Sequence, residues 1–180
     1  GGMGFIEETG AAQYYRDARI LSIYEGTTAI QANDLVGRKT LRDGGAVARQ
    51  LCALVASTEE DLAVHGEPEC ALMRADLTAA RQALESVVAH VLDHGKTDPK
   101  SVYAGAVNYL KLAGYVLCGW QMARALMVAL EKRNEDPAFY GAKVHTAVFY
   151  AQALLPLAQA LASAVVQAGG NTQARPADLF

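Results

Sequence analysis

The sequence predicts an all-α protein, and three features of its pattern lead to this fold class. Apolar residues recur at steps of three and four along several long segments, as on the buried face of a helix. Helix start signals precede two of these segments, at Asp98-Pro99 and Asp136-Pro137. One short apolar run, residues 20–24, could pass for a strand, but no other run offers it a partner. We therefore interpret residues 20–24 as a buried connector between helices.

Two helices are expected near the start of the chain. One follows Thr9, an acceptable N-cap, and ends at about Arg19. The other covers about residues 28–41, because Thr28 and Gln31 have the spacing of a capping box. In that motif the hydroxyl and the amide side chain satisfy backbone groups at the start of the helix.

Four longer helices are expected after Asp43-Gly44-Gly45, which breaks the helical pattern and is predicted to mark a domain boundary. Their predicted spans are about 46–65, 69–93, 98–133 and 136–167. Pro156 is expected to bend the last helix, because a proline inside a helix removes one backbone hydrogen bond. Gly169-Gly170 is expected to end it.

The predicted chain has three parts. Residues 46–170 hold four antiparallel helices joined by short loops, which suffice for an up-and-down four-helix bundle. Residues 1–45 hold only two helices and a connector, so we expect them to be the C-terminal end of a larger helical domain. Residues 171–180 are expected to form a polar tail. The chain begins with Gly1-Gly2-Met3 rather than with Met, which we interpret as a piece cut from a longer protein.

Composition and charge argue against several classes of protein. Hydrophobic residues make up 52% of the chain, which is enough for a buried core and argues against disorder. The net charge is -3 and neither sign clusters, whereas a nucleic-acid-binding protein normally carries a basic stripe. No stretch approaches the ~20 uninterrupted apolar residues of a membrane span, and no signal peptide is visible. We therefore expect neither nucleic-acid binding nor a membrane span.

The candidate metal ligands form no recognised pattern. The sequence contains three cysteines: Cys52, Cys70 and Cys118. They are far apart, without a C-x-x-C pair, so reduced thiols in the cytoplasm are expected. His90 and His94 share a helix face but lack a third ligand, and His65 and His145 are isolated, so no metal site is predicted. The acidic run Glu59-Glu60-Asp61 is expected to face solvent.

The most informative segment is residues 1–41. It contains, in order, Gly1-Gly2-Met3-Gly4-Phe5, Arg16-Asp17-Ala18-Arg19, Ile23-Tyr24-Glu25-Gly26-Thr27 and Ile30-Gln31. These motifs, in this order and spacing, resemble the end of the catalytic domain of FAD-dependent acyl-CoA dehydrogenases. The run from Arg16 to Gly45 is most similar to the large bacterial branch with a helical C-terminal extension, which includes the 3-methylmercaptopropionyl-CoA dehydrogenases.

The resemblance implies a role for each matched residue. Glu25 would be the catalytic base, which removes the α-proton of an acyl-CoA thioester while a hydride leaves the β-carbon for the flavin. Gly26 would bind substrate, because the absence of a Cβ lets the backbone approach the thioester closely. The residues implied near FAD are Gly1, Gly2, Thr27, Thr28 and Ala29. Of these, the two glycines would contact FAD held mainly by a neighbouring subunit.

Glu25 also suits the base role on physical grounds. An α-proton is weakly acidic, so its base benefits from a dry site that raises the carboxyl pKa. The apolar residues 20–24 can supply one wall of such a site. The alternative is that Glu25 only interacts with the dipole of the following helix, an effect worth about 0.3–1 kcal/mol.

The resemblance further implies partners for a full-length parent enzyme: FAD, an acyl-CoA substrate, electron-transfer flavoprotein, and a second copy in a homodimer or homotetramer. The segment alone is expected to bind no flavin and to be inactive, because most of the FAD site would lie before Gly1. Three alternatives stay open, namely a non-enzymatic helical assembly module, the DNA-damage-associated branch of the family, and a flavin oxidase. Acyl chain length and methylthio specificity are not predicted.

Overall fold

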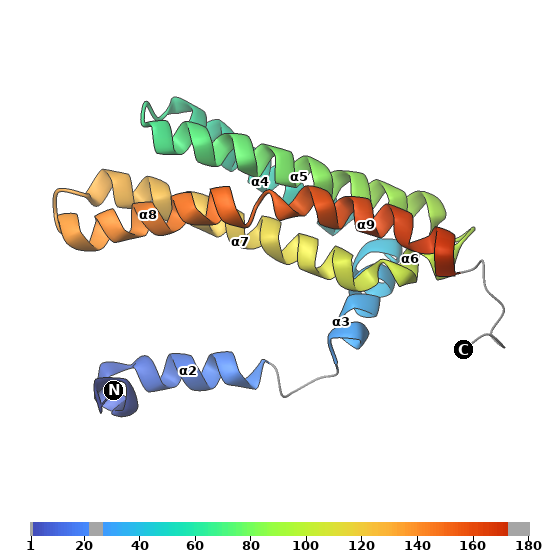
Figure 1. Cartoon of the computed structure of the whole chain (residues 1–180), viewed down its shortest axis with the longest axis horizontal. Helices are drawn as coiled ribbons and strands as arrows, with labels where there is room; N and C mark the ends of the chain where they lie inside the picture. Colours follow the sequence, from blue (N-terminus) through green and yellow to red (C-terminus); the bar gives the residue numbers. More distant parts are fainter. Residues whose placement is uncertain (1, 22–26, 173–180) are drawn as a thin grey trace.

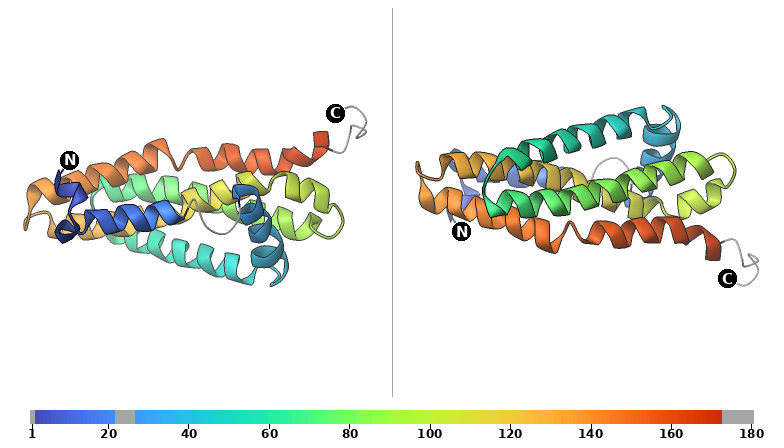
Figure 2. Two further views of the ribbon diagram at one scale, coloured as in Figure 1. Left: turned by 90° about the horizontal axis from the view of Figure 1, so that it is seen from below. Right: turned by 90° about the horizontal axis from the view of Figure 1, so that it is seen from above.

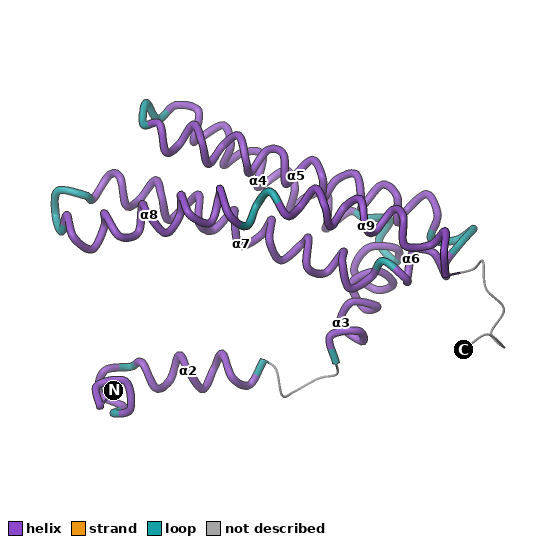
Figure 3. Tube along the Cα trace, viewed as in Figure 1, coloured by secondary structure: helices purple, strands orange, loops and turns teal. Residues whose placement is uncertain are grey.

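The computed structural model describes residues 2–21 and 27–172, and within these ranges it contains helices, turns and loops but no strand (Figures 1 and 3). The prediction of an all-α fold is confirmed. The described residues fall into an N-terminal helical segment, a linking helix, and a long helical extension over residues 46–172.

The N-terminal segment consists of α1 (Gly2–Phe5), the 3₁₀ turn η1 (Glu7–Thr9) and α2 (Ala11–Ile20). These elements contact one another, and none of their residues is buried. Ile20 and Leu21 are exposed, so the described part of the expected connector is not buried within this chain. Figure 1 shows α2 set apart from the helices of the extension.

The N-cap of α2 is Gly10 rather than the predicted Thr9. Gly10 adopts a left-handed conformation with φ 74°, which a glycine adopts without steric cost. The Thr9 hydroxyl donates instead to the carbonyl oxygens of Met3 at 2.6 Å and Ile6 at 3.1 Å. The hydroxyl therefore closes the preceding turn and leaves the helix start to the glycine.

The linking helix comprises α3 (Thr28–Asp34) and the π-helical segment η2 (Leu35–Leu41). Its N-cap is Thr27, whose hydroxyl accepts a hydrogen bond from the Ile30 N–H at 3.5 Å. The predicted cap, Thr28, was one residue late. Both threonines suit the position chemically, and sequence alone does not separate them.

The linking helix packs onto the extension along one face. Ala32, Val36 and Thr40 recur every four residues, and all three are fully buried. The Thr40 hydroxyl donates to the Leu35 carbonyl oxygen at 2.9 Å and shares a buried 2.9 Å hydrogen bond with the Tyr109 hydroxyl of α7. The described residues before the predicted domain boundary are therefore joined to those after it. The boundary itself stays a prediction.

The extension contains the long helices of the molecule. They are α4 (Ala46–Val64), α5 (Pro68–His94), α6 (Pro99–Ala104), α7 (Ala106–Lys132), α8 (Pro137–Ala153) and α9 (Leu157–Thr172). Figure 2 shows them running alongside one another down the long axis of the molecule. The helices α5 and α7 lie centrally, because each contacts α4, α8 and α9 as well as the other. Their facing sides form the core.

Two breaks interrupt the rods of the extension. The break between α8 and α9 falls at the predicted proline, Pro156. Next to it, Leu155 packs against Gly119 of α7. A Cβ added to Gly119 would lie 2.6 Å from Leu155 Cδ2. The break between α6 and α7 falls at Gly105 and was not predicted. An added Cβ there would lie 3.0 Å from the backbone of Val165, so α9 approaches closely at this point.

The predicted helix stop at Gly169-Gly170 was wrong, because α9 continues to Thr172. Gly169 is buried against α6, and an added Cβ there would overlap the Ser101 hydroxyl. This glycine permits close helix packing rather than ending a helix. Most of the expected polar tail, residues 173–180, lies outside the described residues.

Glu59 is buried, which corrects the expectation of a solvated acidic face. Its carboxylate accepts hydrogen bonds from the Thr78 hydroxyl at 2.8 Å and from the Arg81 guanidinium at 2.7 and 3.0 Å. The same guanidinium donates to Glu85 at 2.8 Å. The Arg81 side chain is 14% exposed and that of Glu59 is 8% exposed, so this ion pair joins α4 to α5 largely away from water.

Two stretches, Ala106–Lys132 and Pro137–Gly170, are long and apolar enough to cross a membrane when judged by length and composition alone. Core helices of soluble proteins pass the same test, so this finding is weak support for a span. The second stretch is also interrupted at Pro156. The expectation of no membrane span stays a prediction.

Candidate active-site segment

The structure describes part of the predicted active site. The proposed base Glu25, its neighbour Gly26 and the first glycine, Gly1, lie outside the described residues. Gly2 lies in α1 and is exposed, with no atom within 4 Å of an added Cβ. The geometry below therefore concerns the residues that flank the base.

The residues that follow the base form the exposed N-terminal end of α3. Thr27, Thr28 and Ala29 are consecutive and all exposed. The Thr27 hydroxyl is engaged as the N-cap, and the first amides of an α-helix have no partner within the helix itself. Such a helix start favours an electron-rich group placed against it. This end of α3 therefore fits a polar ligand edge.

The structure does not bring Gly2 together with Thr27, Thr28 and Ala29. Gly2 precedes α2 and the three other residues follow it, so a ten-residue helix, about 15 Å long, separates them. Figure 1 shows the chain start and α3 at opposite ends of α2. The expectation that the glycine turn contacts a flavin held mainly by another subunit stays a prediction.

Large apolar side chains of the N-terminal segment face solvent. The most exposed are Met3, Phe5, Tyr14, Tyr15 and Leu21. Exposed apolar side chains gathered on one short segment indicate a contact surface. The described residues of this segment therefore do not enclose a dry site by themselves.

The extension holds cavities, but their chemistry differs from that of an active site. One cavity of about 350 Å³ is lined by Arg49, Cys52, Glu85 and Asp93 together with apolar residues. Burial raises the pKa of the Cys52 thiol to about 11, so this thiol stays protonated at neutral pH. A protonated thiol is a poor nucleophile.

A second cavity, of about 250 Å³, lies between the linking helix and α4, α5 and α7, and its lining is mainly apolar. Leu51, Leu84 and Leu117 contribute to the walls, and Tyr109 and Lys39 are also part of the lining. Burial raises the pKa of the Tyr109 hydroxyl, so the group is neutral near pH 7. The cavity is a packing defect or an apolar binding volume rather than a reaction centre.

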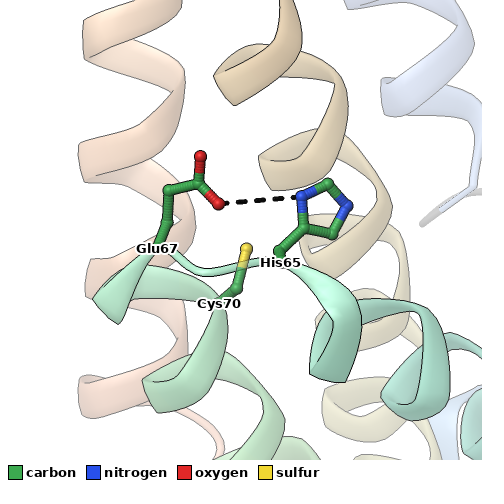
Figure 4. A group of neighbouring side chains, drawn as sticks. All are labelled: His65, Glu67 and Cys70. Carbon is green, nitrogen blue, oxygen red and sulfur yellow. Dashed lines mark ion pairs between the residues drawn. The ribbon is translucent and has the colours of Figure 1, made fainter.

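One cluster of potential ligands was missed by the sequence analysis, which interpreted His65 as isolated. The structure gathers His65, Glu67 and Cys70 at the turn between α4 and α5 (Figure 4). Their spacing, H-x-E-x-x-C across a Gly66-Glu67-Pro68 turn, is not a common metal-binding pattern, so the sequence carried only a weak signal of the cluster. The predicted pair His90 and His94 does stack, with ring centroids 4.4 Å apart.

Comparison with known proteins agrees with the motifs of this segment. The family model described as "Acyl-CoA dehydrogenase, C-terminal domain" matches residues 1–40, and the one described as "Acetyl-CoA dehydrogenase C-terminal like" matches residues 48–174. The chain belongs to the acyl-CoA dehydrogenase family. The resemblance recognised in the motifs is thereby confirmed, and the extension is itself a family domain.

Relatives with assigned functions include large and small members of the family. The chain is 46% identical over 173 residues to the 3-methylmercaptopropionyl-CoA dehydrogenase of Ruegeria pomeroyi, which covers 95% of this chain and 29% of that protein. It is 34% identical to the broad-specificity linear acyl-CoA dehydrogenase FadE5 of Mycobacterium tuberculosis, covering 87% of this chain and 27% of that protein. A 37-residue match, 54% identical, joins it to the human mitochondrial short-chain specific acyl-CoA dehydrogenase, covering 21% of this chain and 9% of that protein. The chain thus spans less than a third of the length of these relatives.

Proposed function

We propose that this chain is the C-terminal part of an FAD-dependent acyl-CoA dehydrogenase, which oxidises an acyl-CoA thioester to the trans-2-enoyl-CoA. The observation that carries the proposal is the ordered set of motifs in residues 1–41, in a chain that is 46% identical to a dehydrogenase of this family. The bound flavin would supply the acceptor for the β-hydride.

Glu25 is proposed as the base. Its carboxylate takes the α-proton of the thioester and holds it while the double bond forms between the α- and β-carbons. The backbone N–H of Glu25 donates to the thioester oxygen as negative charge develops there, which lowers the barrier to proton removal. Gly26 leaves room for the thioester because it has no side chain.

The end of α3 is proposed to lie against the flavin. Thr28 and Ala29 are exposed there, whereas the Thr27 hydroxyl is engaged in holding the helix start. We therefore assign Thr27 mainly to positioning α3 and the two following residues to the cofactor. Gly1 and Gly2 are proposed to contact the flavin of another subunit.

Further properties of the parent enzyme belong to the same proposal. Electron-transfer flavoprotein would reoxidise the flavin, and the enzyme would be a homodimer or homotetramer. The three cysteines, all described, are free thiols, which supports a reducing compartment such as the cytoplasm. A methylthio-propionyl thioester is a candidate substrate because one relative is named for the 3-methylmercaptopropionyl group.

The test uses the full-length enzyme that contains this chain, as wild type and as Glu25→Gln. Flavin absorbance is followed without oxygen while a panel of acyl-CoA thioesters is added, including the methylthio-propionyl thioester. We expect the wild type to bleach and Glu25→Gln to bind substrate but bleach about 10²–10⁴-fold more slowly, as expected when a general base is lost.

A matched control replaces an exposed carboxylate elsewhere in the N-terminal segment. Glu7 lies in η1, and the flavin of the Glu7→Gln variant should bleach at the wild-type rate. Equal bleaching of wild type and Glu25→Gln would show that another group removes the proton. A full-length protein without flavin would instead support the helical assembly module.

A further inference from the structure

The turn between α4 and α5 gathers three side chains of the kinds that bind transition metals. Each offers one ligand atom, the imidazole nitrogen of His65, a carboxylate oxygen of Glu67 and the sulfur of Cys70. These atoms all lie within 4.8 Å of one another, and His65 Nδ1 is 3.7 Å from Glu67 Oε2 (Figure 4). Within residues 2–21 and 27–172, this is the one such group of three.

The local backbone explains why the side chains converge. His65 ends α4 in an extended conformation (φ -81°, ψ 133°), and Glu67 begins α5 in another (φ -73°, ψ 135°). Pro68 occupies the first helical position, and Cys70 lies two residues later, within the first turn of the helix. The Glu67 side chain makes no capping hydrogen bond to α5 and points to His65 instead.

The three residues of the cluster differ in burial. Cys70 is fully buried, while the side chains of His65 and Glu67 are 23% and 31% exposed. The two outer ligands can therefore meet an ion from solution and adjust their rotamers around it. The inner sulfur is held by the packing of α5.

We propose that His65, Glu67 and Cys70 bind a zinc-class divalent ion at the α4–α5 turn, with water in the fourth coordination position. Zinc binds sulfur at about 2.3 Å and nitrogen or oxygen at about 2.0–2.2 Å, so atoms that share a tetrahedral zinc lie about 3.2–3.8 Å apart. The 3.7 Å separation of the nitrogen and the oxygen is slightly longer than the about 3.3–3.5 Å expected when both bind one zinc, so a small movement of either side chain suffices. A rotation of the His65 and Glu67 side chains would bring their distances to the Cys70 sulfur into the range of about 3.2–3.8 Å as well.

The ligand set selects the class of metal. Magnesium and calcium require mainly oxygen ligands, whereas a thiolate together with an imidazole and a carboxylate suits zinc. On binding, the Cys70 thiol releases its proton to water and its sulfur becomes the ligand. The ion would join the end of α4 to the start of α5 and stabilise this hairpin. The inference does not depend on the proposed dehydrogenase activity.

A simple ion pair between His65 and Glu67 explains less of the arrangement. The 3.7 Å separation is longer than a hydrogen bond, and the pair leaves the sulfur of Cys70 unexplained. The stacked pair His90 and His94 is a poorer site, because the Nδ1 atom of His94 already lies 3.0 Å from the His90 carbonyl oxygen. These two residues provide a useful control.

The test measures zinc in the full-length protein that contains this chain. The protein is stripped with a chelator, equilibrated by dialysis against zinc chloride, and its metal content determined by mass spectrometry. We expect the wild-type protein to take up one zinc ion per chain. The variants Cys70→Ser and His65→Gln should each lack this ion. Cys52→Ser and His94→Gln should keep it, since each removes a potential ligand outside the cluster.

Two further measurements separate loss of binding from loss of folding. Circular dichroism compares the helix content of each variant with wild type. X-ray absorption of the zinc-loaded wild type should show one sulfur neighbour at about 2.3 Å with lighter neighbours beside it. The proposal is overturned if wild type takes up no zinc, if folded Cys70→Ser retains it, or if the spectrum contains no sulfur.

Discussion

The N-terminal segment, residues 2–21, and the extension, residues 46–172, are both helical but differ in what holds them in place. In the segment no residue is buried, and Phe5 is 83% exposed. In the extension, residues such as Leu62 and Leu77 are at most 1% exposed and form a continuous core. The difference shows that residues 2–21, which hold most of the first two motifs, lie where the described chain contributes least to its own stability. The geometry of residues 2–21 therefore depends on contacts that the helices of this segment do not make with one another.

The comparison predicts that the largest losses of stability come from buried groups that link helices of the extension. Arg81→Met leaves the Glu59 carboxylate without its main partner in a site that is only 8% exposed. Removing one partner of a buried ion pair costs about 3–5 kcal/mol in the free energy of unfolding. Urea unfolding followed by circular dichroism measures this loss.

The matched control breaks an exposed ion pair. Arg38→Met removes the partner of Asp34 at 3.1 Å, where the arginine side chain is 71% exposed. Such pairs contribute about 0–1 kcal/mol. Similar losses in Arg38→Met and Arg81→Met would contradict the structural role assigned to the Glu59 pair.

The second prediction compares apolar residues of the two regions directly. Leu77→Ala should lower the free energy of unfolding by about 2–5 kcal/mol, because it leaves a cavity in the core. Phe5→Ala should change it by less than about 0.5 kcal/mol, because the ring is exposed in this chain. Denaturant unfolding of the 180-residue chain checks both. A large loss for Phe5→Ala would show that the segment packs on the extension.

The third prediction concerns glycines within helices. Gly169→Ala should destabilise the chain by about 1–3 kcal/mol, because the new methyl group overlaps Ser101. Gly114→Ala, on the exposed side of α7 with no atom within 4 Å of the new Cβ, should stabilise it by about 0.5–1 kcal/mol. Thermal unfolding distinguishes the two signs. Stabilisation by both would mean that α6 and α9 are not closely packed.

Local signals predicted the helices well where a helix boundary depends on neighbouring residues. The Asp-Pro starts are confirmed, since Asp98 accepts the Ser101 N–H at 3.3 Å and Asp136 accepts the Phe139 N–H at 3.0 Å. The recurrence of apolar residues at steps of three and four predicted the ends of α4 and α5 to within about one residue. The core face and the caps lie within one helix, so the sequence alone contains this information.

The errors share a different cause. The break at Gly105 depends on Val165, and the role of Gly169 depends on Ser101, each more than fifty positions away. Glu59 is buried because Arg81 faces it from the next helix. These pairings exist only after the helices have packed, so no local pattern reports them.

For the candidate site, too, local sequence patterns predicted one part and only the structure showed the other. Its motif was recognisable from sequence, because the order and spacing of the motif elements resemble those of the family, while the roles that this resemblance implies for Glu25 and Gly26 stay predictions. The described structure adds the exposed helix start at Thr28 and Ala29. The ligand cluster at His65 was missed because its residues differ in type and follow no common metal-binding spacing. Only the two extended residues at the turn bring them together.

The smallest predicted effect is a pH dependence at the start of the extension. Asp43 accepts the backbone N–H groups of Val47 at 3.1 Å and Gly45 at 2.9 Å. The hydrogen bond from Val47 is the main cause that lowers the pKa of this carboxyl below its usual value of 3.8. A lowered pKa in the folded state contributes stability above the unfolded pKa, and this contribution is lost as pH falls through the folded pKa.

Asp43→Asn keeps a hydrogen-bond acceptor but removes the titrating group. Its melting temperature should therefore fall less than that of the unsubstituted chain between about pH 5 and pH 3, the window in which a lowered carboxyl pKa takes effect. Asp17→Asn, which removes an exposed carboxylate from α2, is the control for the N-terminal segment. If the two variants and the unsubstituted chain lose stability in parallel, Asp43 does not hold the start of α4 through its charge. The acid sensitivity would then have to come from other groups of the extension.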